Sequence, residues 1–154
     1  MTDFNEWLSR RIGDADAVLL NAIVVPVSPD TGLGLTDLLG AWWEHLSKFE
    51  ADLSLSLDDH SVWGVHDYIA ALIIRDHLAR AMLRVEPILV GQVESVVAEV
   101  DRQFMDFTEC DEDGCTERTD GRKDLSRGWW WKRVPMRGPV REELRLSYGH
   151  ESDE

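Results

Sequence analysis

Residues 62–85 read VWGVHDYIAALIIRDHLARAMLRV, and this stretch decides the fold that the sequence predicts. Its apolar side chains recur at helical spacing on two sides of one segment. One stripe consists of Val62, Val65, Ile69, Leu72 and Ile73, and the other of Tyr68, Ile74, Leu78, Met82 and Val85. A helix that is apolar on two sides needs neighbours on two sides. The sequence therefore predicts a central helix over about 60–85 that other helices surround.

Three further segments show the spacing of amphipathic helices, at about 3–25, 36–55 and 87–108. Gly13 lies inside the first segment and weakens it, so a kink or a break is expected there. Four amphipathic segments joined by short connections predict an all-α protein, an antiparallel four-helix bundle over residues 1–108.

Two local features refine this expectation. Pro26 and Pro29 end the first helix and predict a loop before the second, because proline removes an amide donor and restricts the residue before it. In the helix over 87–108, the apolar residues share one face, opposite Glu94, Asp101 and Arg102.

The chain changes character after residue 108. Residues 109–127 contain few apolar side chains and no periodicity, which predicts an exposed acidic loop. Residues 128–148 form an extended Trp- and Arg-rich arm that we expect to pack on the bundle, with a short terminal helix from Pro139 to about Leu146. Residues 149–154 predict a frayed tail. A length of 154 residues agrees with a single domain overall.

Charge is the strongest global signal, since 16 Lys and Arg face 30 Asp and Glu for a net charge of −14. Residues 1–117 contain 7 basic against 23 acidic residues, whereas residues 118–145 contain 9 against 4. An acidic body repels nucleic acid and anionic membranes and favours a basic partner, either another protein or the chain's own C-terminal segment. The alternative is that this charge only keeps the protein dissolved.

The compartment follows from what the sequence does not contain. No apolar run approaches the roughly 18 to 20 residues that span a bilayer, and the N-terminus lacks the pattern of a signal peptide. The 2 cysteines, Cys110 and Cys115, are too few for a disulfide scaffold. We therefore expect a cytoplasmic protein.

The segment around the two cysteines allows several interpretations. Aligned with a calcium loop, positions one, three, five, six, nine and twelve are Glu109, Asp111, Asp113, Gly114, Glu117 and Asp120. The match is poor, because Glu opens the loop, Asp closes it, and Thr116 replaces an apolar residue. The two thiols could instead be half of a zinc site or an oxidised disulfide. A solvated acidic hairpin with two ordinary thiols is favoured, and no cofactor is expected.

Histidines and a charged triplet in the central segment offer a second group of candidates. His66 and His77 lie three helical turns apart, about 16 Å along the axis, which is too far for one metal ion. His45, His66 or His77 with Glu44 or Asp67 could still serve a metal-dependent bundle enzyme. The favoured interpretation is structural, with His66, Arg75, Asp76 and His77 in a buried polar network, since each buried charge needs a partner.

Familiar enzyme motifs are absent from the sequence, so a catalyst is the less favoured class. Interleaved Trp and Arg after residue 128 could stack on single-stranded nucleic acid, but the acidic body opposes that. Trp and Arg also dominate protein interfaces. Acidic side chains on the surface attract basic partners and guide their association. The candidate partner-binding residues are Trp43, Glu44, Asp111, Glu112, Asp113, Trp130 and Arg133.

These observations predict a small acidic protein that works by binding. The favoured form is an inhibitor or immunity-type protein that covers a basic surface of a toxin or nuclease. One alternative is an accessory or structural subunit of a larger assembly, such as one that a mobile element encodes, which docks through the tryptophan arm. The other alternative is the metal-dependent helical-bundle enzyme.

Overall fold

The structure is a computed structural model that describes residues 3–120 and 128–148. Within those residues it contains seven α-helices, a short 3-10 helix and two antiparallel sheets of two strands each. Helix makes up 65% of the described structure, and the rest includes paired strands. The prediction of an all-α four-helix bundle is therefore wrong, and the fold mixes helices with small sheets. Part of the predicted acidic loop, 121–127, and the predicted frayed tail, 149–154, lie outside the described residues.

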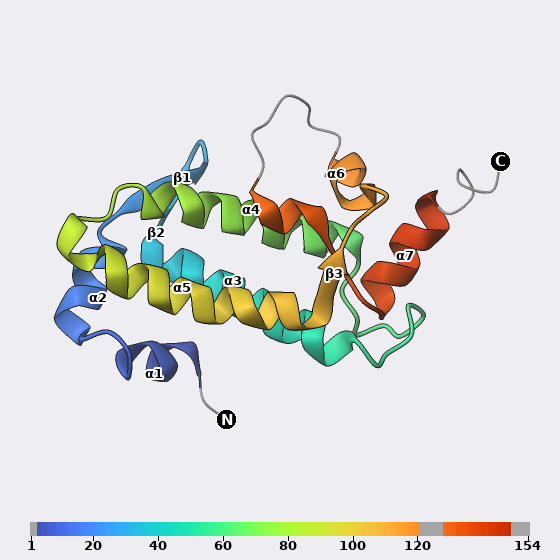
Figure 1. Cartoon of the computed structure of the whole chain (residues 1–154), viewed down its shortest axis with the longest axis horizontal. Helices are drawn as coiled ribbons and strands as arrows, with labels where there is room; N and C mark the ends of the chain where they lie inside the picture. The colour runs from blue at the N-terminus through green and yellow to red at the C-terminus, as the bar shows by residue number, and fades with distance from the viewer. Residues whose placement is uncertain (1–2, 121–127, 149–154) are drawn as a thin grey trace. The chain divides into compact units, whose positions relative to one another are not determined.

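The chain divides into two compact units. Unit 1 comprises Met1–Glu44 and Ile73–Gln103, and unit 2 comprises His45–Leu72 and Phe104–Glu154. Three long helices supply residues to both units, namely α3 (Leu35–Asp52), α4 (Val65–Met82) and α5 (Pro87–Phe107) (Figure 1). These helices lie where the periodicity predicted the second, third and fourth helices, with ends that differ by a few residues.

Unit 1 begins with two short helices, α1 (Phe4–Ser9) and α2 (Asp14–Asn21), where the sequence predicted one helix over 3–25. The break lies at Gly13, as its low helix propensity indicated. Gly13 has extended backbone angles, φ −60° and ψ 149°, at the N-cap of α2. At the start of α1, Asp3 Oδ1 accepts a hydrogen bond from the amide of Glu6 at 2.8 Å. This side-chain cap fixes where α1 begins.

A β-hairpin replaces the loop that the prolines predicted. Strand β1 (Val24–Ser28) pairs with β2 (Thr31–Gly34) in antiparallel orientation, with Pro26 opposite Gly32. Proline is compatible with this sheet because both strands of a two-stranded sheet are edge strands. At the end of β2, a Cβ on Gly34 would lie 2.2 Å from the backbone oxygen of Asn21. Glycine at this position therefore allows the hairpin to pack against α2.

The core of unit 1 is formed by apolar faces of its helices together with β1. Its buried apolar residues are Phe4, Leu8, Ile12, Leu20, Val25, Leu35, Leu38, Leu39, Trp42, Leu78, Ala81, Leu89, Val93, Val96, Val97 and Val100. The one difference from the predicted face of α5 is Asp101, which is only 7% exposed. The sequence placed Asp101 opposite the apolar face, but it follows Val97 by four residues and so lies beside it on the helix.

In unit 2, one strand lies at the start of the predicted acidic loop and another in the predicted extended arm. Strand β3 (Thr108–Cys110) pairs with β4 (Arg133–Pro135), and Glu109 lies opposite Val134. Helix α6 (Cys115–Asp120) follows β3 inside the predicted acidic loop. The tryptophan arm is not extended at its start, since the 3-10 helix η1 (Trp129–Lys132) precedes β4. The predicted terminal helix is present as α7 (Pro139–Tyr148).

The core of unit 2 is rich in aromatic side chains. Its buried apolar residues are Leu46, Phe49, Val65, Tyr68, Ile69, Ala71, Leu72, Phe104, Phe107, Trp130, Trp131, Val134, Val140 and Leu144. Phe104 packs against Tyr68, Phe107 and Trp129 with ring centroids 5.9 to 6.3 Å apart. Contacts of this kind add to the stability that burial alone provides.

None of the helices in residues 3–120 and 128–148 combines the length and the apolar character needed to cross a bilayer.

Candidate functional site

An open groove of about 540 Å³ lies in unit 1 between α1, α2 and the start of α3. We call it the α1–α2 groove. It is lined by Asn5, Leu8, Ser9, Asp14, Ala17, Val18, Asn21, Ala22 and Thr36. Its volume falls in the range of roughly 300 to 1,000 Å³ that ligand sites occupy. The lining combines apolar side chains with amides and hydroxyls, includes one carboxylate, and includes no Lys or Arg.

Contacts within unit 1 hold α1 in place beside this groove. The Phe4 ring lies 5.8 Å from the ring of Trp43, centroid to centroid. The guanidinium of Arg11 donates hydrogen bonds of 2.7 and 3.2 Å to the carboxylate of Glu99 on α5, and it also lies 4.4 Å from the Trp7 ring centroid. These contacts join α1 to α3 and α5, so the groove wall is formed before any partner arrives.

Hydrogen bonds also hold the C-terminal end of α2 in place. Asn21 Oδ1 accepts a hydrogen bond of 3.1 Å from the amide of Asp37, in the first turn of α3. Asp37 Oδ2 accepts another from the amide of Gly34 at 3.3 Å. Together these bonds tie α2, the hairpin and α3, which fixes the second wall of the groove.

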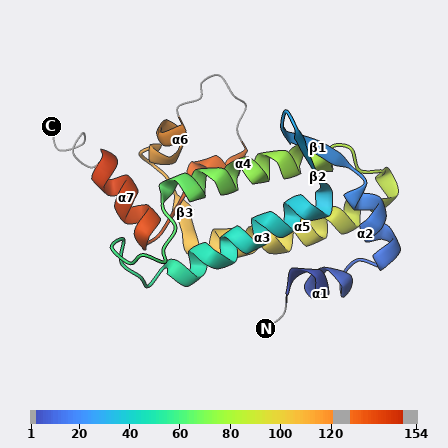
Figure 2. The same ribbon diagram turned by 180° about the vertical axis from the view of Figure 1, so that it is seen from behind.

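Next to the groove, unit 1 exposes large apolar side chains. Val18 and Leu19 on α2 are 71% and 60% exposed, and Leu83 and Ile88, which flank the turn between α4 and α5, are 86% and 83% exposed. Val24, at the start of β1, is 47% exposed. We call these five residues the apolar patch. Figures 1 and 2 both show α2 beside the α4–α5 turn.

A backbone contact connects the two parts of the patch. Arg84 Nη1 donates a hydrogen bond of 2.6 Å to the backbone oxygen of Val24, so the α4–α5 turn meets β1. Glu86 in that turn and Asp14 in the groove are exposed and carry negative charge, while Asp16 on α2 is half-buried. The apolar side chains of the patch are thus accompanied by charged ones of both signs, Arg84 as well as Glu86 and Asp14, and protein interfaces combine side chains of both kinds.

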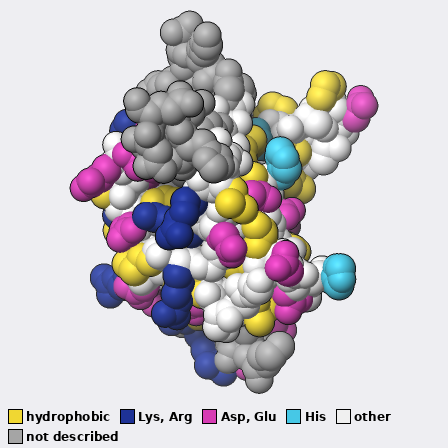
Figure 3. All heavy atoms as spheres, turned by 90° about the vertical axis from the view of Figure 1, so that its right-hand side faces the viewer, with side chains coloured by type: hydrophobic (Ala, Val, Ile, Leu, Met, Phe, Trp, Pro, Cys, Tyr) yellow, Lys and Arg dark blue, Asp and Glu magenta, His cyan; other side chains and the backbone are white. Residues whose placement is uncertain are grey.

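Unit 2 exposes apolar side chains to a smaller degree. Leu55, Met105, Trp129, Met136 and Leu146 are between 36% and 58% exposed. On the face of the molecule drawn in Figure 3, hydrophobic, acidic and basic side chains are interspersed. Partly exposed apolar side chains on such a mixed surface are ordinary for a folded protein.

The predicted partner-binding residues of unit 1 differ in accessibility. Trp43 is half-buried and packs on Phe4, so part of its ring supports α1. Glu44 is exposed. The sequence did not single out the groove or the apolar patch. Leu19 falls at helical spacing with Leu8 and Ile12 and was part of the predicted apolar stripe, whereas Val18 was not, and only the tertiary structure shows that both are exposed.

The predicted acidic binding residues of unit 2 lie in a tight turn between β3 and α6. Asp111 Oδ2 accepts a hydrogen bond of 2.8 Å from the amide of Thr116, and its own amide donates to the backbone oxygen of Lys132 at 2.9 Å. Gly114 has φ +67°, which favours glycine. Asp111 therefore has a structural role, while Glu112 and Asp113 are exposed at the tip.

Two ion pairs join the basic arm to the acidic segment that precedes it. Arg141 Nη1 lies 3.0 Å from Glu109 Oε1, and Lys132 Nζ lies 3.4 Å from Glu117 Oε1. Both pairs are substantially exposed, so each contributes little stability.

Two predicted contact residues of the arm have structural roles. Trp130 is only 7% exposed. Arg133 donates hydrogen bonds from Nε to Thr108 Oγ1 at 2.8 Å and from Nη2 to the Thr108 backbone oxygen at 2.7 Å. Its own backbone oxygen accepts a hydrogen bond from the hydroxyl of Tyr68 at 2.8 Å. These interactions hold β3, β4 and α4 together within unit 2.

Arg75 forms the centre of a buried polar network in unit 1, with partners that the sequence did not identify. Its Nε and Nη2 donate hydrogen bonds of 3.0 and 2.9 Å to the two carboxylate oxygens of Asp101. Trp42 Nε1 donates a third hydrogen bond to Asp101 Oδ1 at 3.0 Å. Of the other predicted members, Asp76 is half-buried, half-buried His77 contacts Arg80 through Nδ1, and His66, in unit 2, is exposed.

The structure also places the candidate metal ligands. His45 packs against the ring of Trp63 with centroids 5.1 Å apart. Asp67 Oδ2 accepts a hydrogen bond from the amide of Gly64 at 3.0 Å and so caps α4. In the predicted calcium loop, α6 begins at Cys115, in the middle of the segment. Across residues 3–120 and 128–148, no three His, Cys, Asp or Glu side chains are grouped so that they could hold a metal ion.

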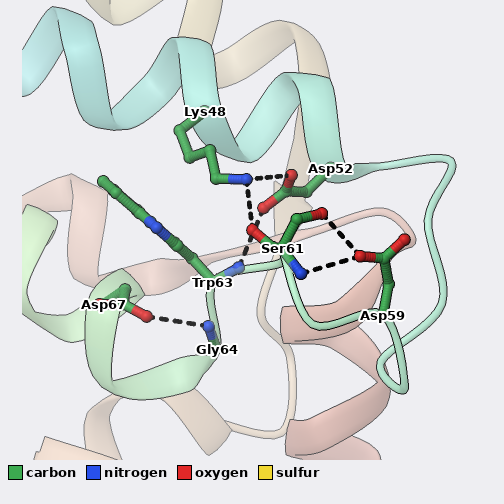
Figure 4. Close-up of polar contacts among 7 residues, drawn as sticks. All are labelled: Lys48, Asp52, Asp59, Ser61, Trp63, Gly64 and Asp67. Atoms are coloured by element: carbon green, nitrogen blue, oxygen red, sulfur yellow. Dashed lines mark hydrogen bonds and ion pairs between the residues drawn. The ribbon is translucent and has the colours of Figure 1, made fainter.

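A second buried carboxylate, Asp52 in unit 2, was not singled out by the sequence. Figure 4 shows it at the end of α3, where it accepts hydrogen bonds from Lys48 Nζ at 2.8 Å and from the amide of Trp63 at 3.0 Å. Lys48 Nζ also donates to the backbone oxygen of Ser61 at 2.6 Å. The pair thereby fastens the loop between α3 and α4. The spacing of Lys48 and Asp52, i and i+4, was the available sequence signal.

The same loop contains a carboxylate whose pKa departs from its ordinary value. Asp59 Oδ1 accepts hydrogen bonds from the Ser61 hydroxyl at 2.6 Å and the Ser61 amide at 2.8 Å. The bond from the Ser61 side chain, followed by that from its backbone, lowers the pKa of Asp59 below 3.8. These bonds form an Asx turn that shapes the loop and have no evident chemical role beyond it.

Tyr68 is the other group with a shifted pKa. Burial is the main cause, and the negative charge of Asp111 adds to it, so that the pKa of Tyr68 lies well above its ordinary value of 10.0 despite the opposing charge of Arg133. The hydroxyl is therefore a permanent hydrogen-bond donor to the backbone of Arg133 at neutral pH.

No protein-family model matches this chain, nor does any curated protein or any solved structure.

Proposed function

We propose that this protein works by binding another protein through the apolar patch and the α1–α2 groove of unit 1. The exposure of the patch carries the proposal. Leu83, Ile88, Val18 and Leu19 are the four most exposed large apolar side chains of the described residues, at 60% to 86%. Removing such area from water contributes roughly 25 cal/mol per Å². Apolar side chains that gather at one place on a surface mark interaction sites more often than isolated ones do.

The negative charge of this chain favours a basic partner. The chain carries a net charge of −14, and the groove lining includes Asp14 but no Lys or Arg. Nucleic acid, anionic membranes and a second copy of this chain all share that sign and are repelled. A basic protein is attracted, which increases its association rate at low salt. We therefore favour an inhibitor or immunity-type protein that covers a basic surface of a toxin or nuclease.

The alternative of an accessory subunit is less well supported. It relied on the tryptophan arm as the docking element, but Trp130 and Trp131 are 7% and 0% exposed, which leaves Trp129, at 40%, as the accessible one of the three. Side chains that already fill the core of unit 2 have little area to offer a partner.

Affinity capture with matched variants tests the proposal. The wild-type chain, Leu83→Ser and Leu146→Ser serve as baits in lysate of the native host at rising salt. Each substitution removes one exposed leucine, of the patch (86% exposed) or of α7 in unit 2 (58% exposed). We expect a basic protein that the wild type and Leu146→Ser capture, that Leu83→Ser loses, and that salt releases. The proposal is contradicted if the amount of captured protein changes neither with salt nor in Leu83→Ser. It is also contradicted if no protein is captured at any salt.

A further inference from the structure

We infer that the α1–α2 groove is a subsite for one Lys or Arg side chain of the partner. This inference rests on the proposed function and makes it more specific, because it assigns the apolar patch to aliphatic side chains of the partner and the groove to a cation. The groove suits such a side chain in its shape, in the chemistry of its lining and in the contacts that hold its walls.

The apolar part of the lining suits the stem of a long basic side chain. Leu8, Ala17, Val18 and Ala22 line the groove, and Leu8 is buried beneath it with 5% exposure. Lys and Arg place their methylene stems along apolar surfaces of this kind while the charged head remains near polar groups. The two alanines leave the space that such a stem requires.

The polar part of the lining suits the charged head. Asp14 supplies a carboxylate, and Asn5, Ser9, Asn21 and Thr36 supply amide and hydroxyl oxygens. Asn21 Oδ1 already accepts one hydrogen bond, from the amide of Asp37, but a carbonyl oxygen has a second lone pair. Hydrogen bonds between a cationic donor and a carboxylate are roughly twice as strong as neutral ones. The amides and hydroxyls can also donate, so the carboxylate of Asp14 decides the preferred charge, because it attracts a cationic head and repels an anionic one.

The walls of the groove are already formed. The Arg11–Glu99 pair, the contact of Phe4 with Trp43, and the bond between Asn21 and Asp37 fix α1 and α2 within unit 1. Binding therefore needs little rearrangement of this chain, which reduces the entropy that association costs.

Peptides of defined composition test the inference on the full chain. The probe is a fluorescein-labelled 12-residue peptide of Leu, Arg and Ala, and its controls replace every Arg with Glu or every Leu with Ser. Fluorescence anisotropy gives the dissociation constants at low and physiological salt. Amide chemical shifts of the labelled protein show where the peptide lies.

Two matched substitutions distinguish the effect of the groove on peptide binding from the effect of the protein's overall negative charge. Asp14→Asn and Asp16→Asn each remove one negative charge from the first turn of α2, but only Asp14 lines the groove. We expect Asp14→Asn to weaken binding of the Arg peptide at least about tenfold and Asp16→Asn by less than about threefold. Ala22→Phe, at the exposed C-cap of α2, fills the groove with a larger side chain and should weaken binding similarly. Circular dichroism confirms that each variant is folded.

The outcomes distinguish this inference from the proposed function. Equal effects of Asp14→Asn and Asp16→Asn, or no effect of Ala22→Phe, overturn the groove as a cation subsite even if a basic protein is still captured. Amide shifts confined to unit 2 overturn it as well. Failure of the Arg peptide to bind, together with capture of no protein from lysate, removes both the inference and the proposed function.

Discussion

Trp42 Nε1 donates a hydrogen bond to Asp101 Oδ1 across 3.0 Å, and the same carboxylate binds the guanidinium of Arg75. Trp42 is fully buried, and Arg75 and Asp101 are 5% and 7% exposed, so the network lies inside the core of unit 1. It joins α3, α4 and α5 at one point. Buried charges of this kind are tolerated only because each has a partner.

Asp101→Asn tests the network. Asparagine keeps the shape and can still accept from Trp42, but it leaves the buried guanidinium of Arg75 without a countercharge. We expect the free energy of unfolding to fall by about 3 kcal/mol, measured by urea denaturation followed by tryptophan fluorescence. The control is Glu99→Gln, which breaks the exposed pair with Arg11 and should cost less than about 1 kcal/mol. Equal losses of unfolding free energy in the two variants would show that burial does not make the Arg75–Asp101 pair more important than the exposed pair.

Asp52→Ala tests the fastening of the loop between α3 and α4. The substitution removes the acceptor of both the Lys48 ammonium and the Trp63 amide. We expect hydrogen exchange at the Trp63 amide to accelerate at least about tenfold and the stability to fall by about 2 kcal/mol. Asp58→Ala, an exposed aspartate of the same loop, is the matched control and should leave exchange at Trp63 unchanged. An unchanged Trp63 amide in Asp52→Ala would show that the carboxylate does not hold the loop.

The pH dependence of the loop follows from Asp59. Hydrogen bonds from Ser61 lower its pKa below 3.8, so the folded state binds the proton less tightly than the unfolded state does. The contribution of Asp59 to stability is therefore present above pH 3.8 and is lost as the pH falls through the folded pKa. Carbon-detected NMR titration should show Asp59 ionising at lower pH than in Ser61→Ala, where the side-chain bond is gone. Identical titration curves in the two proteins would refute this cause.

The raised pKa of Tyr68 leads us to expect a loss of stability at alkaline pH. Burial, with a smaller effect of Asp111, raises its pKa, so the folded state keeps the proton that the unfolded state releases. Its contribution is complete below pH 10.0 and is lost as the pH rises further. In Tyr148→Phe, Tyr68 is the remaining one of 2 tyrosines, and its ultraviolet titration should coincide with alkaline unfolding. Reversible ionisation near pH 10 without unfolding would contradict the burial of the hydroxyl.

Local sequence patterns predicted the long helices. The apolar periodicity of residues 36–55, 60–85 and 87–108 corresponds to α3, α4 and α5, and Pro139 opens α7 as its fixed φ favours. Gly13 marked the break between α1 and α2 through its low helix propensity. In each case the signal arises from residues within a few helical turns of one another, so it can be seen without knowledge of the fold.

The strands could not be predicted in the same way. β1 and β2 are short, and their sequences lack the alternation of apolar and polar residues that identifies a strand. Pro26 argues against a strand, and the need for glycine at position 34 arises only from the close approach of Asn21 in the folded chain. β3 and β4 pair residues far apart in the sequence, such as Glu109 with Val134. The pairing of such segments depends on the packing of everything between them.

The sequence by itself determined the long helices, the acidic charge and the separation of a basic C-terminal segment, because each is a property of neighbouring residues or of composition. Only the tertiary structure decided which acids became buried, since Asp101 meets Arg75 and Trp42 from two other helices. It also decided which apolar side chains stayed exposed. Leu83 and Ile88 are apolar but lie outside the predicted apolar stripes of their helices, and only the structure shows that they are 86% and 83% exposed.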